Sequence, residues 1–115
     1  MKTIAEWHTC KAEEQALLCH CKTVVHQLMP GATLVLYGSR ARGEATSASD
    51  FDLLILVDGE VLPELGEQID NALYDIELAY GVVISAIIFN RQRWNHPRYK
   101  AMPLHQHIDR DGVLL

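Results

Sequence analysis

Eight consecutive residues, 82–89, contain one polar side chain, that of Ser85. Valine, isoleucine and phenylalanine dominate this run, and branched and aromatic residues favour β-strands. Because apolar side chains fall on both sides of such a strand, it must be covered on both faces, and we expect it to be a central strand. The run therefore favours a fold in which helices pack against a sheet.

Helical periodicity flanks this strand and places the rest of the architecture. Apolar residues repeat at three- and four-residue steps in a first helix, and Ile4 and Trp7 extend its apolar stripe. We expect this helix to begin at a Thr3–Glu6 capping box and to end at Pro30–Gly31. The other expected elements are strands at 32–37 and 50–57, a helix at 63–80 closed by Gly81, an irregular segment at 91–102, a helix at 103–110 and a short strand at 112–115. The sequence thus predicts one α+β domain over residues 1–115, a small mixed β-sheet packed against helices.

Composition restricts the partners and the compartment. The net charge of −5 disfavours a general nucleic-acid binder. No apolar run is long enough to span a bilayer and the N-terminus lacks a secretory pattern, so we expect no membrane partner and a cytoplasmic location. The pairs Cys19–Cys21 and His105–His107 diverge on helices, so neither predicts a zinc site, and the histidines are expected at the surface.

The segment after the strand at 32–37 has the features of a phosphate-binding turn. Gly38 lets a ligand approach the backbone closely. Ser39 offers a hydroxyl and an amide at the start of a helical turn, where the unpaired amides favour anions. Arg40 and Arg42 add positive charge beside the turn. Gly38, Ser39, Arg40 and Arg42 are therefore candidate nucleotide-binding residues.

A pair of carboxylates begins the next strand. Asp50 and Asp52 alternate along it, so both project from one face with Cα atoms roughly 7 Å apart, while Phe51 points into the core. Two carboxylates this close repel, and a divalent cation relieves the repulsion. Oxygen ligands on an open site favour Mg²⁺ or Mn²⁺. Each feature alone also fits a plain turn or a solvated strand end; the combination predicts a metal-assisted phosphoryl site.

These residues resemble a known motif. Gly38-Ser39-Arg40-Ala41-Arg42-Gly43, an interval, and Ser49-Asp50-Phe51-Asp52-Leu53 are similar to the motif of the minimal branch of the polymerase-β-type nucleotidyltransferase superfamily. The order of elements and the ending at 109–115, a basic and an acidic residue followed by glycine and apolar residues, resemble that family along nearly the whole chain.

The resemblance implies a mixed-sheet fold, Mg²⁺-dependent binding of a nucleoside triphosphate such as ATP, and transfer of a nucleotidyl group. It implies that Gly38 and Ser39 hold the triphosphate and that Asp50 and Asp52 are the catalytic metal ligands. Minimal members often act as antitoxins beside a separate helical HEPN protein, and some attach AMP to that partner.

The family pattern also includes a third carboxylate on the following strand, which helps to deprotonate the acceptor. The run 82–89 contains no acidic residue, and Ser85 is the expected equivalent. A hydroxyl cannot replace a carboxylate as base. Asp75 and Glu77 lie on the preceding helix and are expected to point outward.

Two functions from different classes follow. The first is a nucleotidyltransferase that transfers AMP from ATP to a protein hydroxyl; the missing acid leaves open whether it turns over. The second is a catalytically degraded, antitoxin-like subunit that neutralises a HEPN partner by binding. An enzyme that adenylylates small antibiotics ranks last, because the chain is short for an added acceptor-binding domain.

Overall fold

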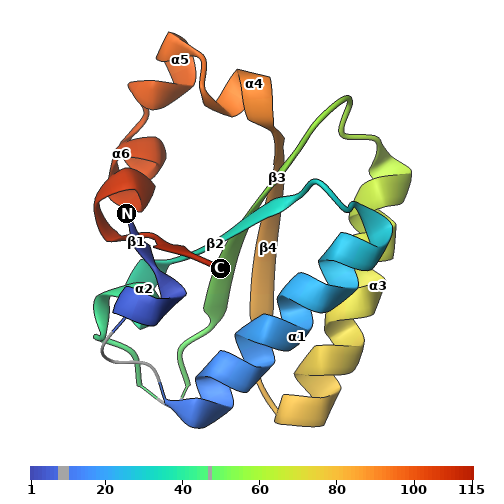
Figure 1. The fold of residues 1–115 in the computed structure, drawn as a ribbon, viewed down its shortest axis with the longest axis vertical. Helices are drawn as coiled ribbons and strands as arrows, with labels where there is room; N and C mark the ends of the chain where they lie inside the picture. The colour runs from blue at the N-terminus through green and yellow to red at the C-terminus, as the bar shows by residue number, and fades with distance from the viewer. Residues whose placement is uncertain (8–10, 47) are drawn as a thin grey trace.

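The computed structural model describes residues 1–7, 11–46 and 48–115. Five strands form one mixed sheet in the order β1-β5-β2-β3-β4 (Figure 1). β3 pairs antiparallel with β2 and parallel with β4, and β5 pairs antiparallel with β2 and parallel with β1. The strands are β1 Lys2–Thr3, β2 Thr33–Tyr37, β3 Phe51–Val57, β4 Ile84–Asn90 and β5 Val113–Leu114. This arrangement confirms the predicted α+β fold with a mixed sheet.

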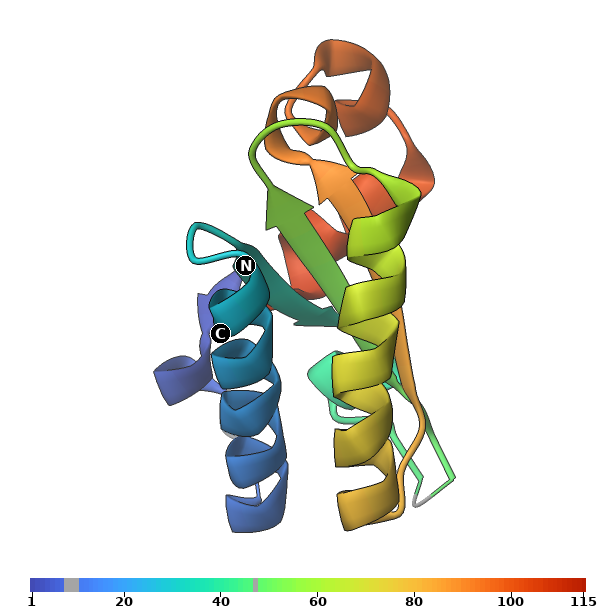
Figure 2. The same ribbon diagram turned by 90° about the vertical axis from the view of Figure 1, so that its right-hand side faces the viewer.

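Two long helices, α1 (Ala12–Leu28) and α3 (Pro63–Tyr80), run side by side over one face of the sheet (Figure 2). Their apolar stripes and the facing strand side chains form the larger of two hydrophobic clusters. α6 (Pro103–Asp111) packs on the opposite face, where Ile108 and Trp94 belong with Val35 to the smaller cluster. None of the helices within the described ranges is long and apolar enough to cross a bilayer.

β4 is an edge strand, so the prediction of a central position is wrong. Its one partner in the sheet is β3. Ile84 and Ile88 face the larger cluster, while Ile87 and Phe89 face the smaller one. Both faces are therefore covered, as the apolar run requires, but composition does not report whether a strand has one neighbour or two.

The N-terminal segment is not one helix. A 3₁₀ turn, η1 (Ile4–Glu6), precedes α1, and residues 8–10 between them lie outside the described residues. The Thr3–Glu6 pair is formed: the Thr3 amide and hydroxyl donate to Glu6 Oε1 at 3.1 and 2.8 Å. This pair caps η1 and not α1. The segment before α1 is held separately, because β1 pairs with β5 and Trp7 is buried in the larger cluster.

The segment 91–102 contains two single-turn helices, α4 (Arg91–Trp94) and α5 (Pro97–Lys100), where an irregular chain was expected. The side chain of the residue before each helix caps it: Asn90 accepts from an α4 amide and His96 from an α5 amide. Trp94 is buried, and Tyr99 meets the Phe89 ring edge-on, so this segment packs back on the core.

His105 is buried, so the expectation of a surface position is wrong for this residue. Its ring stacks on Trp94 with the ring centroids 4.3 Å apart. His105 lies three residues before Ile108, so α6 turns both side chains to the sheet. His107, on the other side of the helix, is exposed as expected.

Candidate nucleotide and metal site

The glycine turn follows β2 without an intervening residue, because α2 (Gly38–Arg42) begins directly after Tyr37. Gly38 has a φ of +78°, a conformation that favours glycine. A Cβ atom at Gly38 would overlap the Asp52 carboxylate and would lie 3.3 Å from its Cγ. The turn and this carboxylate are thus in direct contact.

The strand pairing explains why Asp52 reaches the turn. Asp52 lies opposite Tyr37 in the antiparallel pair and opposite Ser85 in the parallel pair. Asp50 immediately precedes β3, and the Ser85 hydroxyl is 3.5 Å from its Oδ2. Phe51 between the two carboxylates is 2% exposed and points into the larger cluster, as expected. The end of β2 and the beginnings of β3 and β4 therefore meet at one site.

The electrostatics of this site favour a bound cation. Burial, and then the neighbouring Asp50 carboxylate, raise the pKa of Asp52, whereas Arg42 lowers it. Burial and the Asp52 carboxylate also raise the pKa of Tyr37. Each of these shifts records a negative charge that is costly in the folded chain, and a divalent cation between the carboxylates would offset that cost.

Arg40 is occupied by contacts within the chain. Its guanidinium donates to the Ser49 carbonyl through Nε at 3.1 Å and Nη2 at 2.8 Å. It also lies 4.1 Å from the centre of the Phe51 ring and 3.7 Å from the Glu14 carboxylate. The structure therefore places this candidate nucleotide ligand against the loop that leads to Asp50, where it fixes that loop.

Arg42 and Ser39 have more freedom to meet a ligand. Arg42 Nε is 3.1 Å from Glu44 Oε2, in an ion pair whose side chains are 38% and 66% exposed. Such an exposed pair contributes little and can rearrange. Ser39 accepts from the Glu44 amide through its carbonyl, and its hydroxyl makes no hydrogen bond to another described residue.

No group of three or more His, Cys, Asp or Glu side chains in the described part of the chain is placed to hold a metal ion. The two carboxylates still fit Mg²⁺, which is commonly held by one or two protein carboxylates together with substrate phosphates and water. Ser85 occupies the expected position beside the pair, in register with Asp52. Because Ser85 has a neutral hydroxyl, the site has two carboxylates, those of Asp50 and Asp52, and not the three of the family pattern.

Glu77 does not point outward as expected. Its Oε2 accepts a hydrogen bond of 3.0 Å from the amide of Ile84, the first residue of β4. This amide begins an edge strand, and the carboxylate satisfies it. Asp75, two residues earlier on α3, is exposed as expected.

Tyr37 is a site residue that the sequence pattern missed, because it was interpreted only as the last residue of a strand. The hairpin-like pairing of β2 with β3 sets it directly across from Asp52. Counting back from the paired carboxylates to the glycine turn, under the assumption of antiparallel neighbours, would have placed it there.

A glycine turn packed against paired strand carboxylates, on a mixed sheet with helices over both faces, is the arrangement that the resemblance to nucleotidyltransferases predicts. Residues 18–102 match the family model described as "Nucleotidyltransferase domain". Because the match spans most of the chain, the chain belongs to the nucleotidyltransferase domain family.

Two curated relatives are similar over shorter segments. The Methanocaldococcus jannaschii protein named "Putative protein adenylyltransferase MJ0604" is 36% identical over 62 residues, 54% of this chain and 57% of the relative. The Haemophilus influenzae protein named "Probable protein adenylyltransferase MntA" is 44% identical over 46 residues, 40% of this chain and 38% of the relative. The matched segments thus span less than two thirds of either relative.

Proposed function

We propose that this chain binds Mg²⁺ and a nucleoside triphosphate, ATP, and transfers AMP to a hydroxyl of a partner protein. The observation that supports this most directly is the contact between Gly38 and the Asp52 carboxylate, because it joins a phosphate-binding turn to a metal-binding pair. The names of the two relatives both contain the words "protein adenylyltransferase", which supports AMP as the group and a protein as the acceptor.

The residues have distinct roles in this proposal. The backbone at Gly38 and the amide and hydroxyl of Ser39 bind phosphate oxygens, and Arg42 adds positive charge. Asp50 and Asp52 hold Mg²⁺, which when bound supplies charge stabilisation at the phosphate oxygens. Arg40 positions the loop before Asp50 through its bonds to Ser49.

The transfer itself exchanges one bond for another. The acceptor oxygen forms a bond to the α-phosphorus, the bond from that phosphorus to the bridging oxygen breaks, and diphosphate leaves. The hydroxyl proton passes to solvent, because Ser85 stands where a carboxylate base would lie. We expect turnover about two to four orders of magnitude below that of a site with a full base.

We propose as partner a separate helical protein of the HEPN type, which the chain would inactivate in a toxin–antitoxin pair. The presence of two carboxylates instead of three favours a second candidate function, in which the chain neutralises the same partner by binding alone. In that case the site would be a remnant that serves nucleotide binding or nothing.

The decisive experiment is label transfer from α-phosphate-labelled ATP with Mg²⁺, with and without the protein encoded beside this chain. We expect label on the partner, lost in the Asp50→Asn/Asp52→Asn variant. Neutralisation of the partner by that variant, undiminished and with no label in the wild type, would show that contact and not AMP transfer is the mechanism.

A further inference from the structure

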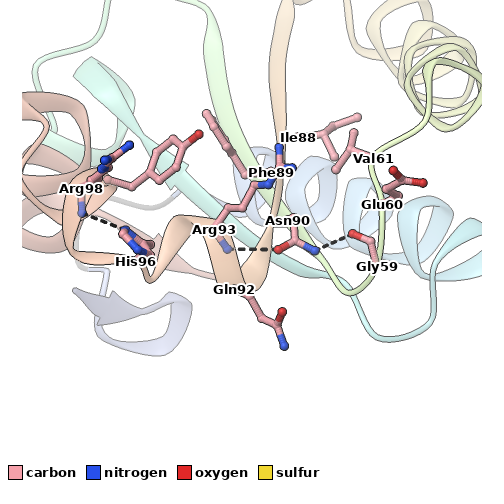
Figure 3. Close-up of a pocket in the computed structure, with 11 residues that line it drawn as sticks. Gly59, Glu60, Val61, Ile88, Phe89, Asn90, Gln92, Arg93, His96 and Arg98 are labelled. Atoms are coloured by element: carbon pink, nitrogen blue, oxygen red, sulfur yellow. Dashed lines mark hydrogen bonds between the residues drawn. The ribbon is translucent and has the colours of Figure 1, made fainter.

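A cavity lies at the other end of the sheet, away from the carboxylates. It has a volume of about 840 Å³ and is formed by the end of β4, by α4 and α5, and by residues 59–61 (Figure 3). This volume is within the range of ligand-binding cavities. In Figure 1, α4 lies near the top of the molecule, whereas α2, which carries the glycine turn, lies at the left in the lower half.

Positive charge is concentrated at this cavity. The segment 91–100 contains four of the ten Lys and Arg residues and no Asp or Glu, in a chain of net charge −5. Arg91 is paired with Asp58 at 3.0 Å. Arg93 and Arg98 line the cavity, and neither has a carboxylate within 4.0 Å in the described part of the chain. Two guanidinium groups are therefore available to an anionic ligand.

The cavity also has an apolar and aromatic wall. Phe89 packs between Trp94 and Tyr99, with ring centroids 5.2 and 5.8 Å away, so the wall is fixed by the core beneath it. Val61, on the opposite side, is 38% exposed. The combination suits a ligand that carries both acidic groups and an aromatic or aliphatic side chain.

The Glu60 carboxylate favours an acidic polypeptide over a nucleic acid as the ligand of this cavity. Glu60 lines the cavity and lies across it from Arg98 (Figure 3). A nucleic-acid strand carries a phosphate at every step and would meet this charge. A polypeptide can place its acids at Arg93 and Arg98 and an uncharged residue at Glu60.

The strand pairing shows how a protein could reach both ends. Leu56 pairs with Phe89 as Asp52 pairs with Ser85, so the cavity wall and the carboxylates share one face of the sheet. Phe89 lies four residue steps along β4 from Ser85, roughly 13 Å. The edge of β4 between them has no strand partner in the described sheet. A protein lying along this edge contacts both sites.

We propose that this cavity docks an acidic segment containing aromatic residues from the partner protein, and so holds the acceptor near Asp50 and Asp52. This inference rests on the proposed function for the identity of the ligand as the acceptor protein. The binding itself needs neither nucleotide nor metal, so it can be tested separately.

The probe is a fluorescein-labelled copolymer of glutamate and tyrosine, rich in glutamate, titrated with the chain in the absence of ATP and Mg²⁺. The test variant is Arg93→Glu/Arg98→Glu, and the matched control is Lys2→Glu/Lys22→Glu, which makes the same charge change at an exposed and a half-buried position outside the cavity lining. Thermal unfolding checks that both variants are folded.

We expect the test variant to lose about tenfold or more in copolymer affinity and the control to change less than about threefold. Asp50→Asn/Asp52→Asn should bind the copolymer as the wild type does. Equal losses in the two charge variants, or tighter binding of a single-stranded RNA of similar length, would overturn the docking proposal. Copolymer binding without label transfer would overturn the proposed function and leave the docking site standing.

Discussion

Gly38 and Gly81 share a left-handed backbone but differ in their surroundings. Their φ values are +78° and +67°, and a Cβ would overlap the Asp52 carboxylate at Gly38 but meet nothing within 4 Å at Gly81. We expect Gly81→Ala to cost about 1 kcal/mol, the backbone penalty alone, and Gly38→Ala roughly 2 to 4 kcal/mol. Urea unfolding measures both. Equal costs would mean that the carboxylate moves away freely and does not constrain the turn.

Asp52 should reduce stability at neutral pH when no metal is bound. Burial and Asp50 raise the pKa of Asp52, so the folded chain holds this proton more tightly than the unfolded chain does. The stabilisation that this proton binding gives is complete below the unfolded-state pKa and is lost as pH rises through the folded-state pKa. We expect Asp52→Asn to raise the Tm at pH 7 in EDTA by about 2–4 °C, with the difference shrinking in acid.

We expect Mg²⁺ to reverse the order of the Tm values of the wild type and Asp52→Asn, because Mg²⁺ stabilises only the protein that binds it. Asp75→Asn, at an exposed position on α3, is the control and should change little under either condition. An identical response of Asp52→Asn and the wild type to Mg²⁺ would contradict the metal assignment.

The two described cysteines should differ sharply in reactivity. Cys19 is exposed, whereas burial raises the pKa of Cys21 to about 12, so that almost none of its thiolate forms near neutral pH. In a Cys10→Ser background, we expect a thiol-reactive dye at pH 8 to label Cys19 alone until denaturant is added. Rapid labelling of both thiols in the native protein would show that α1 opens readily.

At the scale of elements, local signals predicted what they physically determine. α3 has the predicted bounds because Pro63 favours the first helical turn and Gly81 takes the left-handed conformation that ends it. The edge position of β4 was not predictable, since its composition reports covered faces and not lateral neighbours. β1 was missed because two residues carry no periodicity.

The candidate site was likewise predictable where local sequence determines it and not where tertiary structure does. Its residue types and their spacing were visible in the sequence, because strand alternation fixes the faces of Asp50 and Asp52. Tyr37 and Glu77 needed the pairing of β2 with β3 and the start of β4, which come from tertiary structure.

The junction of α6 and β5 gives a test of packing between elements. Gly112 has an ordinary φ of −64°, but a Cβ there would overlap the Ile108 carbonyl and lie 2.9 Å from Val35 Cγ1. We expect Gly112→Ala to cost about 1–3 kcal/mol. Gly66→Ala, inside α3 with open space around it, should instead stabilise by about 0.5–1 kcal/mol. Chemical unfolding of both variants checks the opposite signs.

At the scale of the whole molecule, one sheet separates two cores that each contain a tryptophan. Trp7 lies in the larger cluster and Trp94 in the smaller. Because the strands are shared, we expect the two layers to unfold together. In the variants Trp7→Phe and Trp94→Phe, the remaining tryptophan's fluorescence should change at the same denaturant concentration as the circular dichroism. A separate midpoint for Trp94 would show that 91–111 unfolds first.

The position of Ser85, in register with Asp52 and beside Asp50, has an evolutionary consequence. If the proposed roles hold, one exposed side chain on the edge strand β4 separates a binder from an enzyme, without a change in the backbone or the core. We expect Ser85→Asp to raise label transfer by about two to four orders of magnitude where the wild type is slow. Under the proposed function, loss and recovery of catalysis would then be one mutational step on an unchanged fold.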